Sequence, residues 1–461
     1  MASDGKGQRA VVADLMADAL ERSERYLDTA MTRSVAATLA ARSALGGFDE
    51  PLEVGGRPAA ETVEMLDELG SPGTVISNGP RYFGFVTGGS QPVAAAASLL
   101  ATAWDQNGAL PIMSPTVAAI DAVTVRWILG LLGLPSTATA TFCGGASEAN
   151  LIGMITARDE VLRRAGWDVP ADGLIGAPMV TVITSEETHA SMKKAVALAG
   201  LGRDRMMLVP TDDQGRMVAT ALPAIEGPAI VVLQAGNVNT GHSDPFREVI
   251  AAAHDAGAWV HVDGAFGLWA AAAPERARLV EGMEAADSWA TDAHKWLNVP
   301  YDNALAIVAD GDALGRSMRV DGAYLPSTSE RSPMQLGLQM SQRARAIPVW
   351  AVLRTLGRQG VSDLIERNCS LASRFAQRLA EGGAEVLHDV CLNQVLVAFG
   401  DDETTSAVID AVQADGTCWA GGTEWNGRRA MRISVSGHET TEADVDRSAA
   451  VMLGCWESLP G

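Results

Sequence analysis

Several residue types are scarce in this 461-residue chain, and each scarcity excludes a class of protein. The five cysteines are odd in number and never form a C-x-x-C pair, which argues against a disulfide framework or a thiolate metal site. Lysine and arginine total 35 against 56 acidic residues, and the net charge of −21 disfavours nucleic acid and anionic membranes as partners. No apolar run reaches the ~20 residues of a membrane span, and no signal peptide opens the chain. We therefore expect a soluble cytoplasmic protein whose partners are small molecules.

The pattern of apolar residues predicts four parts along the chain. Residues 1–75 form helical segments that are too poor in core residues to fold alone, so we expect them to lie on a partner subunit or on the main body. Between 76 and 325, short apolar β-rich runs alternate with helices, which is typical of a mainly parallel sheet covered on both faces. A looser stretch over 326–344 precedes a smaller α+β C-terminal domain over 345–461.

In such a sheet, ligands bind beyond the carboxyl ends of the strands, where this chain places its polar clusters. The first cluster, TFCGGASEAN, predicts a strand, a glycine turn and a helix start. Its backbone N–H groups and one hydroxyl could surround an anion, and these come from Gly144, Gly145, Ala146 and Ser147. A helix cap formed by Ser147 explains the same residues equally well. This stretch is neither a P-loop nor a G-x-G-x-x-G motif, which disfavours a nucleotide.

Two further clusters contain histidine. HVDGAF places Asp263 at a strand end, two residues after His261 and on the same strand face. Such a pair would suit a metal, but no third ligand is nearby, so we expect none. A buried acid at a strand end needs a cationic or N–H partner to remain charged. His189 falls at a strand-to-helix junction, where a lone histidine is more often a helix cap or a hydrogen-bonded core residue than a catalyst.

The stretch SWATDAHKWLNVP, residues 288–300, places Asp292, His294 and Lys295 at the end of an apolar run. A loop lysine is most often solvated, but Trp296 and Leu297 flank this one. An amine in apolar surroundings is suited to Schiff-base formation. An anion cradle, a ring-stacking residue, a carboxylate and such a lysine together match the requirements of pyridoxal 5′-phosphate (PLP).

With these motifs, the chain resembles the PLP-dependent group II amino acid decarboxylases, relatives of the aromatic amino acid and glutamate decarboxylases. The matching stretches run in order over about residues 75 to 455 and are GGASEAN, THASMKKA, QAGNVNTGHSDP, HVDGAFG, DAHKWLNVPYD and MRISVSGHETTEADV. The resemblance implies an α/β fold of the fold-type-I architecture, with a mainly parallel seven-stranded sheet in the large domain. It also implies a homodimer whose two subunits build each site.

The resemblance further implies a role for individual residues. Lys295 would be the Schiff-base lysine, Asp263 the partner of the pyridine nitrogen, and His189 the residue stacked on the ring. The other residues implied around the cofactor are Gly145, Ala146, Ser147, Ala265, Asp292 and His294. Asp292 departs from relatives that often carry asparagine there. Because a phosphate would repel its carboxylate, we expect Asp292 to face elsewhere or to bond a neighbouring hydroxyl.

A second departure concerns the reaction. Aromatic decarboxylases carry, in the region of residues 324–345, a mobile loop whose tyrosine protonates the carbanion, whereas no tyrosine follows Tyr324 here. We expect an L-amino acid decarboxylase. The alternatives are a carbon–carbon lyase of the aldolase type, an aldehyde-forming enzyme of the same fold and, least favoured, a catalytically silent binding protein. We also expect the loop to close over substrate and to supply a proton through a held water or through Ser327, Thr328 or Ser329.

Two sets of residues bear on the substrate. Four aromatic residues could line the mouth of the site and favour an aromatic or apolar substrate, or could equally belong to the core; they are Tyr82, Phe83, Phe85 and Trp104. Arg343, Arg345 and Arg432 are candidates for binding a carboxylate, although arginines in such positions are more commonly structural.

Overall fold

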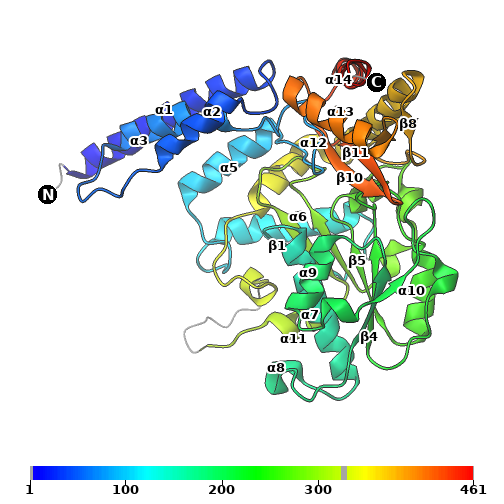
Figure 1. Cartoon of the computed structure of the whole chain (residues 1–461). Helices are drawn as coiled ribbons and strands as arrows, with labels where there is room; N and C mark the ends of the chain where they lie inside the picture. Colours follow the sequence, from blue (N-terminus) through cyan, green and yellow to red (C-terminus); the bar gives the residue numbers. More distant parts are fainter. Residues whose placement is uncertain (1–3, 323–329, 460–461) are drawn as a thin grey trace.

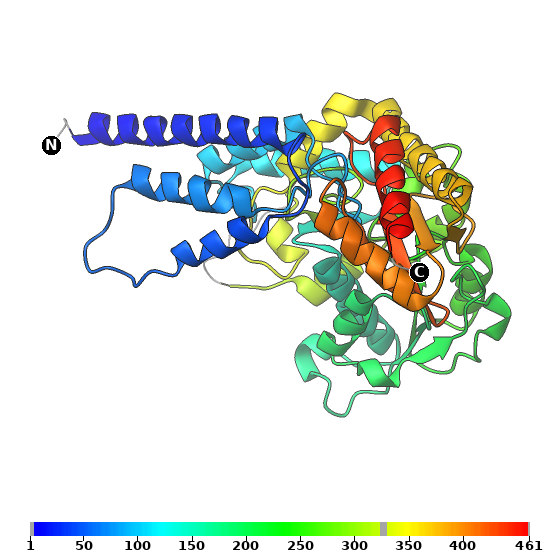
Figure 2. The same ribbon diagram turned by 45° about the horizontal axis from the view of Figure 1, so that its top comes forward.

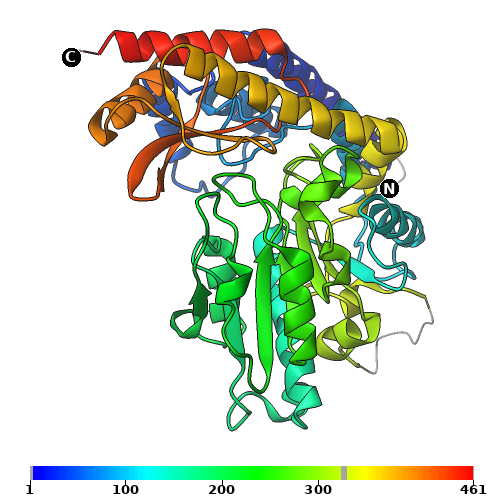
Figure 3. The ribbon, with the colours of Figure 1, turned by 90° about the vertical axis from the view of Figure 1, so that its right-hand side faces the viewer.

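The computed structural model describes residues 4–322 and 330–459. It contains one sheet of seven strands, in the order β1-β7-β6-β5-β4-β2-β3, and one of four, in the order β10-β11-β9-β8. The smaller sheet and its helices lie as an upper tier on the body built around the larger sheet (Figures 1 and 3). The expectation of a mainly parallel seven-stranded sheet is confirmed.

The strands of the large sheet are short, with bounds β1 (Thr139–Cys143), β2 (Thr181–Ser185), β3 (Met207–Val209), β4 (Ala229–Gln234), β5 (Trp259–Asp263), β6 (Ser288–Asp292) and β7 (Ala304–Val308). Strands β2 to β6 pair in parallel, and β7 runs antiparallel to both β6 and β1. The connection from β6 to β7 is too short for a crossover helix, so β7 has to reverse direction. The carboxyl ends of β1, β5 and β6 therefore meet at one edge.

Helices cover both faces of this sheet. One face packs against α7 (Ala146–Arg164), α9 (Ala190–Leu198) and α11 (Gly311–Met318), and the other against α6 (Pro115–Leu131), α10 (Phe246–Asp255) and the first half of α12 (Ala346–Glu381). In β5, Val260 and Val262 enter one core and Trp259 enters the other. Burial on both sides explains why these strands are continuous apolar runs in the sequence.

The remaining elements lie outside this core. The upper tier contains β8 (Glu385–Val386), β9 (Gln394–Ala398), β10 (Gly421–Trp425), β11 (Arg428–Ser434), α13 (Asp402–Asp415) and α14 (Glu442–Glu457). The other α-helices are α1 (Asp4–Ala30), α2 (Leu39–Ala44), α3 (Ala59–Met65), α4 (Ser71–Gly73), α5 (Pro92–Trp104) and α8 (Val169–Asp172). Short 3-10 segments are η1 (Leu45–Phe48), η3 (Arg203–Arg205), η4 (Ala219–Ala221), η5 (Gly267–Ala272), η6 (Ala277–Val280), η7 (Met283–Ala285) and η8 (Pro333–Gln335), and η2 (Leu66–Gly70) is a π-helical turn. No described helix has the length and apolar character needed to cross a membrane.

The N-terminal helices form an arm that projects from the body (Figure 2). Helices α1, α2 and α3 lie alongside one another there, and many of their apolar side chains face solvent. We call this unit, residues 4–70, the N-terminal arm. Among its described side chains only Ala30 and Val35 are buried hydrophobics, and neither belongs to a core cluster.

Helix α12 connects the two tiers. Its residues up to Cys369 pack in the core of the large sheet, whereas those from Leu371 onward pack in the core of the upper tier. Gly357 interrupts the helix with a left-handed φ of 62°, which a glycine adopts without steric cost. The division of the chain into domains at residue 345 stays a prediction, and side-chain packing favours a change of tier within α12.

Part of the predicted mobile loop is held by side-chain contacts. Arg331 Nε donates to Asp121 Oδ1 at 2.6 Å. The side-chain amide of Gln335 pairs with both backbone polar groups of Val320, at 2.8 and 3.0 Å. A closing movement must therefore break these contacts or leave the second half of the loop in place. Closure stays a prediction, and the proposed proton donors lie outside the described residues: Ser327, Thr328 and Ser329.

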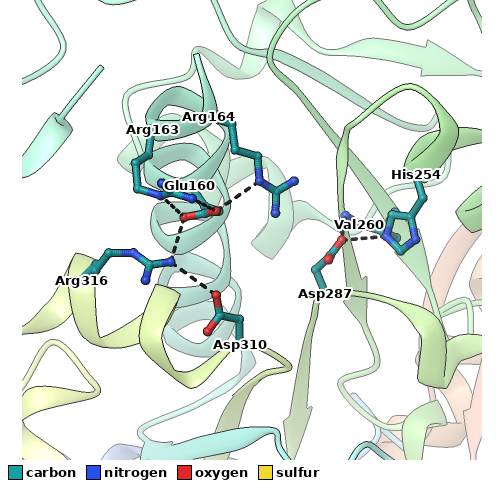
Figure 4. Close-up of polar contacts among 8 residues, drawn as sticks. All are labelled: Glu160, Arg163, Arg164, His254, Val260, Asp287, Asp310 and Arg316. Carbon is teal, nitrogen blue, oxygen red and sulfur yellow. Dashed lines mark hydrogen bonds and ion pairs between the residues drawn. The ribbon is translucent and has the colours of Figure 1, made fainter. Parts of the chain in front are cut away.

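A buried glutamate anchors the outer end of α7. Glu160, with a side chain only 6% exposed, accepts hydrogen bonds from Arg163 at 2.8 Å, Arg164 at 3.1 Å and Arg316 at 3.0 Å (Figure 4). The hydrogen bond from Arg163, with those from Arg316 and Arg164, lowers the pKa of Glu160 to about 2. Because Arg316 belongs to α11, this cluster joins two helices that cover the same face of the sheet.

Glu160→Gln should lower the free energy of unfolding by about 1–2 kcal/mol at neutral pH, since charge-assisted hydrogen bonds are lost. The pKa of Glu160 lies below its unfolded value of 4.5, so its contribution is complete above that pH and fades as the pH falls toward 2. Urea unfolding at several pH values checks this. The matched control is Glu381→Gln, which removes a surface partner of Arg378 and should change little. Equal effects of the two variants would contradict the role of Glu160.

Candidate active site

The polar clusters predicted at the strand ends lie together in the structure. Cys143, Asp263 and Asp292 are the last residues of β1, β5 and β6, which end at the same edge of the sheet. The turn with Lys295 follows β6, and the N-terminus of α7 follows β1. Each is brought there by the parallel arrangement of the strands, as expected for this class of sheet.

Lys295 points toward a carboxylate. Its Nζ lies 3.0 Å from Oδ2 of Asp292, and its side chain is 20% exposed, so the amine remains accessible. Trp296 and Leu297, which flank it, are each 1% exposed and fix the turn. The lysine therefore has apolar neighbours along the chain, as the sequence indicated, and an ionic partner that the sequence did not reveal.

Asp292 caps helix α7. Its Oδ1 accepts the N–H of Ala146 at 2.6 Å, and His294 Nε2 lies 3.6 Å from the same oxygen. The expectation that Asp292 would face elsewhere or bond a hydroxyl was wrong, because a buried carboxylate takes the strongest donors within reach, a helix-terminal N–H and an ammonium. The alternative that Ser147 caps the helix was also wrong. The Ser147 hydroxyl is exposed and makes no hydrogen bond with the described residues.

Asp263 is buried near Lys295. Its Oδ2 accepts a hydrogen bond from Asn150 Nδ2 at 3.0 Å, and its Oδ1 accepts one from the backbone of Ala265 at 3.3 Å. Burial raises the pKa of Asp263, and the charges of His189 and Lys295 oppose that rise. The acid thus has the donor partners that it was predicted to need. Asn150 was missed, although it ends the quoted motif SEAN.

His189 lies at the open side of the site, as the N-cap of α9. Its Nδ1 accepts the N–H of Ser191 at 3.2 Å and contacts the Ser191 hydroxyl at 2.7 Å. The capping role considered in the sequence analysis is therefore present, and the residue remains exposed. Desolvation lowers the pKa of His189, and the positive charges of Lys295 and Arg432 lower it further.

His294 is held between two neighbours. Its Nδ1 accepts the N–H of Asn303 at 3.1 Å, and its ring lies 4.3 Å from the ring of Tyr301. The other ring nitrogen then carries the proton and faces Asp292. Burial lowers the pKa of His294, which keeps the ring neutral despite the nearby carboxylate.

Asn298 joins the lysine turn to the upper tier and was missed from sequence. Its Nδ2 donates to the carbonyl groups of Trp296 at 2.8 Å and Ser436 at 2.9 Å, and its Oδ1 accepts from the backbone of His438 at 2.9 Å. Its φ of 57° is left-handed, a conformation that asparagine tolerates better than most residues. The position of Lys295 consequently depends on contacts made by both tiers.

The aromatic candidates separate into two groups. Phe83 is 1% exposed and packs edge-on against Phe375, so it belongs to the core. Tyr82 and Phe85 stack on Trp419 with ring centroids 5.1 and 5.5 Å apart, and the side chain of Phe85 is 64% exposed. Trp104 is partly exposed at the end of α5.

The arginine candidates also differ. Arg345 is buried and pairs with Asp302 at 3.0 Å, which makes it structural, and Arg343 is largely exposed. The guanidinium of Arg432, in β11, makes no ion pair or hydrogen bond with the described residues, yet burial lowers its pKa. It is a partly buried, unpartnered guanidinium near His189.

These groups fit PLP. The amine of Lys295 is accessible, and the Asp263 carboxylate, whose pKa is raised by burial, would gain from a cationic ring nitrogen as a partner. The exposed hydroxyl of Ser147, at the N-terminus of α7, has no hydrogen-bond partner among the described residues and suits a phosphate. The exposed imidazole of His189 offers a flat surface on which the cofactor ring could stack.

Comparison with known proteins supports the same cofactor. The family model described as "Pyridoxal-dependent decarboxylase conserved domain" matches residues 63–400. Phenylacetaldehyde synthase of Arabidopsis thaliana is 24% identical over 417 residues, 83% of each chain. Tryptophan decarboxylase 1 of Oryza sativa subsp. japonica is 27% identical over 420 residues, 82% of this chain and 80% of the relative.

A solved structure shows the same fold. The crystal structure of Oryza sativa TDC with PLP and tryptamine superimposes with a TM-score of 0.88, at 21% sequence identity and with 97% of both chains covered. The family match extends over most of the chain and includes every strand end described above. The chain therefore belongs to the pyridoxal-dependent decarboxylase family and is a PLP-dependent amino acid carboxy-lyase.

Proposed function

We propose that this carboxy-lyase acts on an aromatic L-amino acid. The observation that carries the proposal is a strip of aromatic rings that leads from the site to solvent: Tyr301, Tyr82, Trp419 and Phe85. Tyr301 lies on His294, Tyr82 lies near Tyr301, and Trp419 stacks on both Tyr82 and Phe85. Stacked aromatic surfaces favour a flat apolar ligand. The relatives named for tryptophan and phenylacetaldehyde chemistry favour the same class.

Backbone strain at the outer end of this strip supports a functional role. Phe85 and Val86 both have left-handed φ values, 52° and 57°, although neither is glycine. Such conformations are rare for bulky and β-branched residues and are concentrated at functional sites. They turn the side chain of Phe85 outward while Val86 stays in the core.

The roles of the site residues follow from their positions. PLP supplies an aldehyde that can bind covalently to an amine and a ring that accepts the electron pair left when the carboxyl group departs. Lys295 is proposed to hold the aldehyde carbon, and Asp263 to keep a proton on the ring nitrogen. His189 covers the ring face, and Ala265 lies beside Asp263 at the strand end.

The opposite end of the site is proposed to receive the phosphate. Ser147, with Gly145 and Ala146, presents a hydroxyl and the N-terminus of α7. Asp292 holds the Ala146 N–H and the ammonium of Lys295, so in this proposal it positions the lysine. His294 lies between this carboxylate and Tyr301 and lines the same end of the site.

Arg432 is proposed to bind the carboxylate of the substrate. A guanidinium matches a carboxylate in charge and in geometry, and this one has no protein partner among the described residues. Its position near His189 places it at the open side of the site, where a substrate enters.

Aldehyde formation is the second candidate function. The loop over 326–344 contains no tyrosine, and one relative is named phenylacetaldehyde synthase. Without a phenol to deliver a proton after carboxyl loss, part of the reaction could be diverted to the aldehyde. Hydroxyl groups or a held water, as proposed for this loop, are weaker acids than a phenol.

We further propose a cytoplasmic homodimer. The N-terminal arm exposes apolar side chains along α1, which include Val12, Met16, Leu20 and Leu27 at 56, 38, 48 and 52%. Exposed apolar stripes of this size favour burial against another chain. All five cysteines are free thiols, which is consistent with a reducing compartment.

Lys295→Ala should abolish the visible absorbance of the holoenzyme and its turnover together, because the covalent anchor of the cofactor is lost. The chain has only four lysines, Lys6, Lys193, Lys194 and Lys295, so borohydride reduction followed by peptide mapping gives an unambiguous result. Lys194→Ala, at an exposed position in α9, is the matched control and should behave as wild type. A reduced adduct on any lysine other than Lys295 would contradict the assignment.

Wild-type enzyme should release CO2 and the amine from L-tryptophan, L-tyrosine or L-phenylalanine faster than from L-glutamate. Phe85→Ala should lower kcat/KM for the aromatic substrate by roughly 2- to 10-fold, the value of one aromatic contact. The control, Met179→Ala, removes an equally exposed apolar side chain that is outside the aromatic strip (69% exposed) and should have no effect. Measuring amine, aldehyde and glycine separates the candidate reactions. A preference for L-glutamate would overturn the proposed substrate class.

Sedimentation should give the mass of a dimer at micromolar concentration. Leu20→Glu should shift the protein toward monomer, because a charge then has to be buried in the interface. Glu24→Gln, a change at an exposed position of the same helix, should leave the dimer intact. An active wild-type monomer would rule out this arrangement.

A further inference from the structure

A chain of hydrogen bonds runs behind Asp263, away from the open site. Strand β5 directs Trp259, His261 and Asp263 to the same face, where α7 covers them. Asn150 of α7 and Ser288 of β6 complete the chain. All four residues behind the acid are at most 1% exposed: Asn150, Trp259, His261 and Ser288.

The distances connect these side chains without a break. Trp259 Nε1 lies 2.8 Å from Ser288 Oγ, and Ser288 Oγ lies 2.8 Å from His261 Nδ1. His261 Nε2 then lies 3.0 Å from Asn150 Oδ1. Asn150 Nδ2 donates to Asp263 Oδ2 at 3.0 Å.

The chemistry of the end residue sets the direction of the whole chain. An indole N–H can only donate, so Ser288 Oγ accepts from Trp259. Among the described residues, His261 Nδ1 is the only acceptor within reach of the buried Ser288 hydroxyl, so the hydroxyl hydrogen points to it. The proton of His261 is then on Nε2 and bonds to Asn150 Oδ1. This arrangement leaves the NH2 group of Asn150 facing Asp263. Each donor thus points toward the acid, and none of the links can be reversed alone.

The packing keeps the imidazole neutral and in place. Burial lowers the pKa of His261 to about 3, so the ring does not take up a second proton near neutral pH. A Cβ at Gly153 would lie 2.4 Å from Cε1 of His261, which shows how closely α7 packs on the ring. A side chain at residue 153 would therefore clash with the ring.

We propose that this one-way chain, from Trp259 to Asp263, keeps the Asp263 side chain ionised by presenting it with a donor that cannot turn away. The inference rests on the proposed role of Asp263 as partner of the cofactor ring. Asn150, His261, Ser288 and Trp259 are positioning residues, since they act on the ring only through Asp263. Without the chain, the Asn150 amide could present its oxygen to the carboxylate, which would favour the protonated acid.

The first experiment needs no cofactor. Nitrogen NMR of the apoprotein, with His261 assigned among the seven histidines by His261→Gln, should show a proton on Nε2 and none on Nδ1 from pH 5 to pH 9. Ser288→Ala should alter the Nδ1 signal, because that atom loses its donor. A His261 that carries its proton on Nδ1, or that titrates in this range, would overturn the direction of the chain.

The second experiment uses the holoenzyme and Asn150→Leu, which keeps the volume of the side chain and removes the donor. We expect kcat to fall roughly 10- to 100-fold, the equivalent of one hydrogen bond to a charged group. The acid limb of the pH profile should move to higher pH, and nitrogen-labelled PLP should show a less protonated ring nitrogen. The matched control is Asn368→Leu, because Asn368 is fully buried in α12 and neither of its side-chain polar atoms has a partner among the residues that the structure describes.

The outcomes are distinguishable. Suppose that Asn150→Leu keeps the pH profile and the ring-nitrogen signal of the wild type, while Asp263→Asn is strongly impaired. That result would overturn the inference and leave the role of Asp263 intact. Near-normal kcat in Asp263→Asn would overturn that role and the inference with it. If Asn150→Leu does not fold, Ser288→Ala takes its place, with a smaller shift of the pH profile in the same direction expected and an unchanged profile counting against the proposal.

Discussion

Two buried carboxylates need hydrogen-bond donors, and this need determines how the residues of the active site are arranged. Asp263 and Asp292 end adjacent parallel strands and are 6 and 2% exposed, so each has to find its donors inside the protein. Helix α7 supplies one donor to each, the Asn150 amide and the Ala146 N–H. The helix is thereby fixed against both strand ends, and the cradle formed by its N-terminus follows from that position.

The same demand determines where the lysine lies. Asp292 Oδ2 takes the ammonium of Lys295 while Oδ1 takes the helix N–H, so one carboxylate sets the position of both. An asparagine at this position could accept the helix N–H but could not form the ion pair. The ion pair with Lys295 and the hydrogen bond from Ala146 therefore explain why an aspartate suits position 292.

The turn with Lys295 also depends on segments distant in sequence. Asn298 connects it to the carbonyl of Ser436 in the upper tier. A Cβ at Gly88 would lie 1.7 Å from the carbonyl oxygen of Lys295, so only glycine allows the chain to pass there. Changes in the upper tier or near residue 88 should consequently disturb the lysine without touching the cofactor pocket itself. The aromatic strip, which includes Trp419 of the upper tier, couples the same two regions.

The sequence by itself determined the architecture and the locations of the reactive groups. Apolar runs that alternate with helices specify a parallel sheet, strand periodicity places His261 and Asp263 on one face, and motif spacing places Lys295 just beyond a strand end. Only the tertiary structure decided the partners. Whether Ser147 or Asp292 caps α7, and whether Phe83 or Phe85 reaches solvent, depends on contacts between residues far apart in the chain, such as Ala146 with Asp292. The periodicity of apolar residues along a helix or strand predicts which face a side chain occupies. Its neighbours on that face are determined only when distant segments of the chain pack together.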